Sequence, residues 1–150
     1  MLRGSCAFSK RVWRSWSFER EILMGNLVVR NALCQCTFGA APAPLQVTSQ
    51  ATVNGSAQTA ATIMDMPKLP MTFGMCSNPA NPTVAAATAA ALGVLTPMPC
   101  IPACAAPWTP GSPTVLICSK PALNNSSKCM CSYGGVISVT MTPALTIQIP

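Results

Sequence analysis

Proline and glycine interrupt this chain so often that neither long helices nor long strands can form over most of its length. The sequence has 15 prolines and 9 glycines among 150 residues. Proline fixes its φ angle and lacks a backbone donor, and glycine favours turns. Only 5% of the residues are aromatic although 50% are hydrophobic, so the core must use small side chains. We predict a small, mainly β domain of short strands joined by tight turns.

Charged residues make up 8% of the chain, against roughly 25% in an average soluble protein. The formal net charge is +6. After position 23, however, the only basic residues are Arg30, Lys68, Lys120 and Lys128, which are far apart. Scattered charges form no basic patch, so no nucleic-acid partner is expected. The sequence also predicts no transmembrane segment and no signal peptide, because its apolar runs are short and interrupted.

Residues 1–23 differ in composition from the rest of the chain. They hold seven of the twelve charged residues, together with Trp13 and Trp16. The composition changes abruptly at Met24. We predict that residues 1–23 are an extension outside the domain, with Met24 as the true start, and that residues 24–150 form one domain. The alternative is a basic, tryptophan-containing interaction tail.

Two segments carry hairpin signals. Asn54-Gly55 lies between short extended runs, which predicts a hairpin over residues 52–64. A second hairpin is expected over residues 114–123. The two are weakly alike, which hints at an internal duplication. Other strands are expected at residues 27–36, 45–49 and 136–141.

One alanine-rich helix is expected. Asn81 is a favourable N-cap, and Pro82 suits the first helical position. The helix should continue from Thr83 to Leu92, with Gly93 as its C-terminal cap. Because its surface is nearly all alanine, we expect it to lie close against another element.

Nine cysteines and no histidine determine which metal chemistry is available. Cys34 and Cys36, like Cys129 and Cys131, are separated by one residue, so on a strand each pair presents both thiols to one face. Tetrahedral zinc sites take four sulfur or nitrogen ligands. Two other interpretations stay open. The cysteines can form disulfides in an oxidising compartment, or they can be small buried side chains, as we expect for Cys118.

The sequence offers little material for a catalytic site. After residue 23 the only carboxylate is Asp65, and no histidine is present to activate a serine or cysteine nucleophile. Asp65 is expected to cap a turn after its hairpin, since aspartate readily bonds to nearby backbone amides. We therefore predict that the protein is not an enzyme and has no small-molecule substrate.

From Met24 onward the chain resembles the PAAR-like proteins, long catalogued as a domain of unknown function. They are found with bacterial contractile injection systems, including type VI-like secretion systems. The resemblance covers nearly all of residues 24–141. It is carried by residues 32–39, 53–55, 61–65, 73–76, 81–93, 97–100, 107–108, 111–113, 120–123, 129–131 and 134–137.

The resemblance implies a zinc site. The cysteines that fall at the family's cysteine positions are Cys36, Cys76, Cys100, Cys129 and Cys131. Three others are additional: Cys34, Cys104 and Cys118. We predict that zinc is bound by four of the first five, with Cys129 as the one left out. The tips of the family usually use histidines with a cysteine, and this chain has no histidine.

The resemblance also implies a function. PAAR tips are short cones of β-hairpins, so we expect a structural spike tip that caps a trimeric spike protein. Such a tip helps to pierce the target membrane, contacts it transiently, and can carry effector proteins. It would assemble in the bacterial cytoplasm and then be secreted or injected with the spike.

Three sides are expected to meet the spike. The hairpins at residues 52–64 and 114–123 would form two of them, and the strand from Gly134, with Val136 and Ile137, the third. Trp108 is expected to pack across the cone, because it is the only tryptophan after residue 23. Two alternative functions stay open: a secreted, disulfide-rich surface or toxin-like module, and a zinc-thiolate redox sensor.

Overall fold

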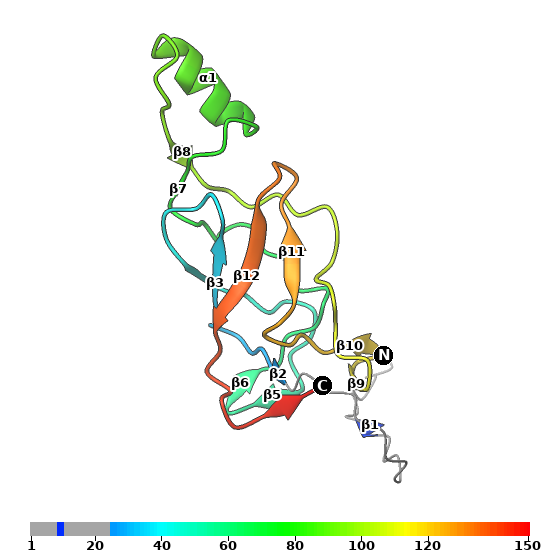
Figure 1. Cartoon of the computed structure of the whole chain (residues 1–150). Coiled ribbons are helices and arrows are strands. Elements are labelled where there is room, and N and C mark those ends of the chain that lie inside the picture. The colour runs from blue at the N-terminus through cyan, green and yellow to red at the C-terminus, as the bar shows by residue number, and fades with distance from the viewer. Residues whose placement is uncertain (1–8, 11–24) are drawn as a thin grey trace, which may run out of the picture.

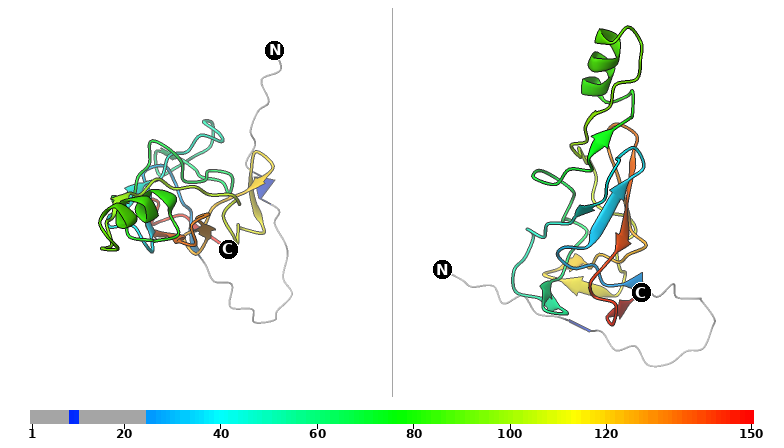
Figure 2. Two further views of the ribbon diagram at one scale, coloured as in Figure 1. Left: turned by 90° about the horizontal axis from the view of Figure 1, so that it is seen from above. Right: turned by 90° about the vertical axis from the view of Figure 1, so that its left-hand side faces the viewer.

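Figure 1 shows the computed structural model of the chain, which describes residues 9–10 and 25–150. Within these residues the fold is mainly β, with one short helix and several small antiparallel sheets. The molecule tapers from a broad end built of paired strands to a narrow end formed by the helix (Figures 1 and 2). The predicted cone of short hairpins with one alanine-rich helix is therefore confirmed.

A four-stranded antiparallel sheet runs through the middle of the molecule in the order β11-β12-β3-β4. The strands are β3 (Leu33–Cys36), β4 (Ala43–Pro44), β11 (Lys128–Met130) and β12 (Val136–Met141). Ile137 of β12 lies opposite both Cys36 and Cys129. Cys34 and Cys36 are buried while Gln35 between them is exposed. The prediction that two cysteines separated by one residue lie on the same face of a strand is thus confirmed for Cys34 and Cys36 in β3.

Three strand pairs form the broad end, which we call the base (Figure 1). They are β5 (Asn54–Gly55) with β6 (Gln58–Thr59), β9 (Val115–Ile117) with β10 (Lys120–Pro121), and β2 (Gly25–Asn26) with β13 (Gln148–Ile149). The first two confirm the predicted hairpins. The prediction that the strand from Gly134 forms the third side is wrong, because β12 belongs to the four-stranded sheet and Ile137 is fully buried. The third side joins the start of the domain to its end.

The three pairs of the base are related by an internal pseudo-three-fold axis. A closed cycle of backbone hydrogen bonds joins Val28, Leu123 and Ala61. The Val28 N–H donates to Leu123 O at 2.9 Å, the Leu123 N–H to Ala61 O at 3.0 Å, and the Ala61 N–H to Val28 O at 2.9 Å. Each of these residues lies two positions after the end of β2, β6 or β10. The three segments are therefore structurally equivalent.

A second cycle runs around the same axis in the opposite sense. It begins two residues further on, where the Arg30 N–H donates to Thr59 O at 2.8 Å. The equivalent bonds run from Ile63 to Pro121 and from Asn125 to Asn26, both at 3.1 Å. The sequence hinted that two hairpins are duplicates. The two closed cycles, with matching positions in each segment, show that the base is a three-fold repeat.

The turn of the first hairpin lies two residues later than predicted. Ser56 and Ala57 form it, with φ angles of 50° and 63°. Gly55 instead belongs to β5, where an added Cβ atom would come within 2.9 Å of Leu27 Cδ2. The second hairpin turns in the same way at Cys118 and Ser119, with φ angles of 50° and 62°. Gly55 is thus needed for close packing against Leu27 rather than for the turn.

The strand predicted at residues 45–49 does not form, because a carboxylate takes the backbone donors there. Thr48 N–H and Ser49 N–H both donate to Asp65 Oδ1 at 2.8 Å. Asp65 is buried, and its Oδ2 accepts from the Thr62 N–H at 2.9 Å. Asp65 therefore caps the turn that follows its hairpin, as predicted, and also ties a distant loop to that turn.

Helix α1 (Pro82–Ala90) begins as predicted, with the Asn81 side chain accepting from the Thr83 N–H at 3.1 Å. The helix rises from the paired strands β7 (Met75–Cys76) and β8 (Met98–Pro99). The expectation that it lies close against another element is wrong, because Val84 is its only buried residue. No helix in the described part of the chain has the length and hydrophobicity needed to cross a membrane.

Two hydrophobic clusters fill the interior. The larger contains Trp108, Phe73 and Leu45, and the smaller lies at the base around Leu27 and Ile117. Trp108 is fully buried, and its indole Nε1 donates to the carbonyl oxygen of Asp65 at 2.9 Å. The prediction that it packs across the cone is confirmed. Cys118, expected to be buried, is only half-buried at the edge of the smaller cluster.

The predicted boundary at Met24 stays a prediction. Within the extension, β1 (Ser9–Lys10) pairs antiparallel with β9. Residues 1–8 and 11–24, including Trp13 and Trp16, lie outside the described residues.

Candidate metal centre

Four of the five predicted ligand cysteines line one small cavity, which we call the thiol cavity. Cys36 is the last residue of β3 and Cys76 the last of β7, while Cys100 directly follows β8 and Cys131 directly follows β11. All four side chains are buried. The thiol cavity thus lies between the four-stranded sheet and the strand pair β7–β8. Figure 1 shows how these strands are arranged.

Backbone pairing explains why cysteines so distant in sequence meet. Strands β7 and β8 pair with Cys76 opposite Met98, and the Cys100 N–H donates to Gly74 O at 2.7 Å. A bridge between Gly39 and Cys76 connects this pair to the turn after β3. On the other side, the Cys131 N–H donates to Gly135 O at 2.8 Å. Each cysteine is therefore held by a backbone that is itself paired.

Gly135 leaves the space that the thiols occupy. A Cβ atom at this position would lie 2.8 Å from Cys36 Sγ and 3.6 Å from the Cβ of Cys131. The other residues that line the thiol cavity are Phe38, Asn78, Ile101 and Tyr133. Asn78 Nδ2 donates to the Tyr133 carbonyl oxygen. These wall residues were not predicted as site residues. Gly134-Gly135 was expected only as the start of a strand.

The thiols interact electrostatically. Burial, followed by the Coulomb interactions with Cys76 and Cys36, raises the pKa of the Cys100 thiol to about 12. Burial and neighbouring thiolates both disfavour a charge on Cys100, so its thiol favours the protonated form when no metal is bound. A divalent cation would reverse this preference, because it stabilises every thiolate that coordinates it.

Cys129 does not line the thiol cavity. Its Sγ donates to Ala106 O at 3.4 Å. A hydrogen bond with Cys104 lowers the pKa of the Cys129 thiol, and the same hydrogen bond, together with burial, raises the pKa of Cys104. Cys34 lies nearby, where burial and then Cys129 raise the pKa of its thiol to about 12. Cys129, which was predicted to be left out of the ligand set, thus interacts with the additional cysteines Cys34 and Cys104. The spacing of the cysteines in the sequence did not indicate this interaction.

Comparison with protein families places the chain among known sequences. The sequence model of the domain of unknown function DUF4280 matches residues 28–143. The chain belongs to this family. The match contains all four cysteines of the thiol cavity and begins after the predicted extension. No curated protein matches the chain. No solved structure matches it either.

The thiol cavity of this DUF4280 domain is small and is lined by soft sulfur donors. Its free space is about 10 Å³, close to that of a single water molecule. Seven cysteines in the described residues are free thiols, and the four that line the cavity are among them. Four is the number of ligands that a tetrahedral zinc site takes. Within the described residues, however, no group of three or more cysteine or carboxylate side chains is arranged so that it could hold a metal ion. Zinc binding therefore stays a prediction.

If zinc binds, Cys36, Cys76, Cys100 and Cys131 are the residues that would hold it. Zinc would supply folding free energy by joining segments that are distant in sequence. The four cysteines come from β3, β7, and the segments after β8 and β11. A single ion would thus tie the helix-bearing strands to the four-stranded sheet.

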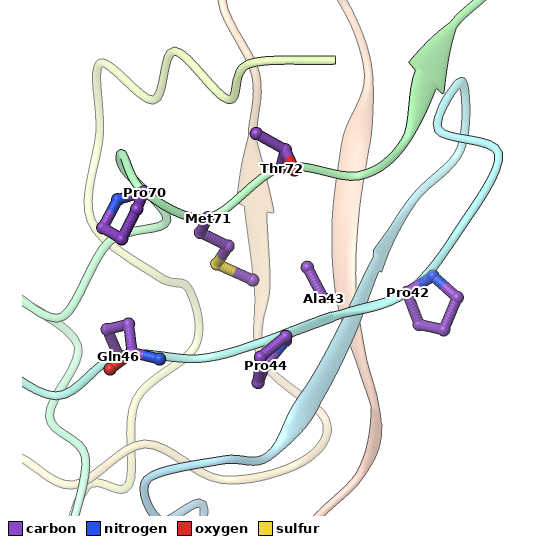
Figure 3. A pocket seen from close by; sticks show the side chains of 7 residues that line it. All are labelled: Pro42, Ala43, Pro44, Gln46, Pro70, Met71 and Thr72. Atoms are coloured by element: carbon purple, nitrogen blue, oxygen red, sulfur yellow. The ribbon is translucent and has the colours of Figure 1, made fainter. Parts of the chain in front are cut away.

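A second hollow of this DUF4280 domain lacks comparable chemistry. It has a volume of about 170 Å³ and lies between two facing proline-containing segments (Figure 3). The lining residues are Pro42, Ala43, Pro44, Gln46, Pro70, Met71 and Thr72. None of these side chains is ionisable or a thiol, so the hollow offers no candidate metal ligand or acid-base group.

Proposed function

We propose that this DUF4280 domain is the structural tip of a bacterial contractile injection system and caps the trimeric spike protein of that system. The observation that carries the proposal is the pseudo-three-fold base, with its two closed cycles of backbone hydrogen bonds. A monomer that caps a trimer must offer three similar surfaces to three identical chains. The base supplies them within a single chain.

The outer strands of the base provide a means of attachment. Strands β5, β9 and β13 each pair on one side with their partner in the base. Ser9–Lys10 pairs with the other side of β9, which illustrates that such an edge accepts an extended segment. Strands of a spike trimer could add to these edges by the same backbone pairing.

The shape and composition of the domain fit the rest of the proposal. A taper from the base to the helix suits a piercing tip (Figure 2), and zinc in the thiol cavity would stiffen the junction between the two ends. The buried carboxylate of Asp65 is occupied by backbone and hydroxyl donors, in keeping with a non-enzymatic role. In this proposal the protein assembles in the cytoplasm, leaves with the spike and can carry effector proteins.

Three equivalent exposed residues provide the test. Asn54, Leu116 and Gln148 hold the same position in β5, β9 and β13, each opposite the second residue of the inner strand. Each would be replaced by Glu, singly and together, and binding to the spike protein encoded beside this one would be measured by co-purification and titration. Because docking on a trimer would bury each charge without a partner, we expect each single change to weaken binding by a similar factor, at least about tenfold.

The triple variant should abolish binding, since effects at separate sites are roughly additive in free energy. Met130→Glu is the matched control, because Met130 is also exposed and on a strand but lies in the central sheet. Thermal melting would confirm that all variants are folded. If all of the base variants bind like the unchanged protein, or if none binds and the unchanged protein does not bind either, the proposal is wrong.

One observation favours the redox-sensor alternative. Cys104 is the only partly exposed thiol among the seven free cysteines, and it is hydrogen-bonded to Cys129. Peroxide attacks thiolates, so the reactive group of this pair would be Cys129, whose pKa is lowered, with the neighbouring Cys104 as the thiol that could then close a disulfide with it. Release of zinc by peroxide at concentrations that leave spike binding intact would support this second function. Zinc that stays bound until the domain unfolds would exclude it.

A further inference from the structure

We propose that the end of the helical protrusion, residues 91–96, is a lipid-binding tip that inserts into the interfacial region of an uncharged bilayer. The inference rests on the proposed function in taking the helix as the leading end. Its observations are separate from those of the base.

Large apolar side chains gather at this tip without any cover. Leu92 is 97% exposed, Val94 68% and Leu95 50%. Helix α1 ends just before them, at the narrow end of the molecule and far from the base (Figures 1 and 2). Three such residues within four positions at an extremity differ from scattered exposed apolar residues, which are normal on protein surfaces.

Most backbone N–H groups of residues 91–96 are bonded within the protrusion. The N–H groups of residues 91–94 all donate to carbonyl oxygens of residues 87–91. The Thr96 N–H donates to the Thr88 hydroxyl at 3.2 Å, and the Thr96 hydroxyl donates to Val94 O. The bonds from Leu92 and Gly93 to Ala89 O and Thr88 O form a common helix C-cap, and this internal bonding also lowers the number of unpaired polar groups that would enter hydrocarbon, where each is costly. Leu92 and Gly93 achieve it by adopting positive φ angles of 57° and 90°.

Charge distinguishes a lipid from a protein as the occupant. The chain contains no charged residue between Lys68 and Lys120, so the whole protrusion is neutral. Protein–protein contacts are usually anchored by aromatic or arginine side chains and surrounded by a polar rim. The tip has neither an aromatic residue nor a charge. Apolar side chains on a neutral, internally bonded loop match the acyl-chain boundary of a bilayer instead.

Vesicle flotation tests the proposal with the full chain. We expect the protein to float with phosphatidylcholine vesicles, equally well in low and high salt, because no charge is involved. Leu92→Asp should reduce the bound fraction at least about tenfold, since it puts a charge in place of an apolar group that insertion would bury in lipid. The matched control is Leu145→Asp, at an equally apolar residue that is 67% exposed but lies next to β13 at the base.

Several results would overturn the proposal. One is a protein that does not float with phosphatidylcholine, and another is binding that needs anionic lipid and disappears in salt, which would point to basic residues elsewhere in the chain. Equal loss in both variants would show a non-specific effect. A dimer that Leu92→Asp converts to a monomer would identify a second copy as the occupant. Leu92→Asp should still bind the spike protein, so failure of spike docking and failure of lipid binding remain distinguishable.

Discussion

Gly135 and Cys36 approach so closely that a Cβ atom on Gly135 would lie 2.8 Å from the Cys36 sulfur. Gly135→Ala should therefore displace that thiol without removing any donor. We expect zinc affinity to fall at least about tenfold, comparable with the effect of changing a residue that orients a ligand. Competitive chelator titration of the reduced protein measures it. Ser132→Ala, at an exposed neighbour, is the control. Unchanged zinc affinity in Gly135→Ala would place the metal elsewhere.

Two cysteine substitutions separate the proposed ligands from their neighbours. Cys100→Ser should lose zinc, because Cys100 lines the thiol cavity. Cys129→Ser should retain about one zinc per chain, because Cys129 contacts Ala106 and Cys104 instead. Elemental analysis of protein purified under reducing conditions checks both. Loss of zinc from Cys129→Ser alone would reverse the assignment.

Asp65→Asn should destabilise the domain strongly. Each oxygen of the Asp65 carboxylate accepts hydrogen bonds from at least two donors, so an amide NH₂ group in place of either oxygen would face donors. The expected loss is about 2–3 kcal/mol, measurable as a lower midpoint in urea unfolding. Ser49→Ala, which removes one of these donors, should cost about 1 kcal/mol. Equal stability of Asp65→Asn and the unchanged protein would contradict this account.

Substitutions before the displaced hairpin turn and within it should change the stability of the domain in opposite directions. Gly55→Ala should destabilise by about 1–3 kcal/mol, because its methyl group would meet Leu27 and Ile147. The double change Ser56→Asn, Ala57→Gly should stabilise by about 0.5–1 kcal/mol, because both positions have positive φ angles. Thermal melting of both variants decides. If Gly55→Ala stabilised the domain and the double change destabilised it, Asn54-Gly55 would form the turn after all.

A chain that starts at Met24 should melt within a few degrees of the full chain in reducing buffer. The only pairing described for the extension is that of the two residues of β1 with β9, and each hydrogen bond contributes about 1 kcal/mol. Circular dichroism during heating measures the difference. A loss of about 10 °C or more would show that the extension is part of the fold.

Local sequence signals predicted those features whose causes lie within a few residues. Asn81 and Pro82 start the helix because capping depends on adjacent groups alone. The hairpins around residues 52–64 and 114–123 were found from turn and strand residues for the same reason. The exact turn was missed because Gly55 is required by contact with Leu27, a residue distant in sequence.

Composition and local patterns alone predict small core side chains, frequent turns at prolines, a short capped helix, and cysteines as the abundant metal-binding residues. Which of these residues lie together depends on contacts between segments that are distant in sequence. Cys36, Cys76, Cys100 and Cys131 line one cavity, and Cys129 does not. The third side of the base comes from β2 and β13, at opposite ends of the domain. Both the grouping of the thiols and the cycle through Val28, Ala61 and Leu123 depend on long-range backbone pairing, and such pairing leaves no periodic signal in the sequence.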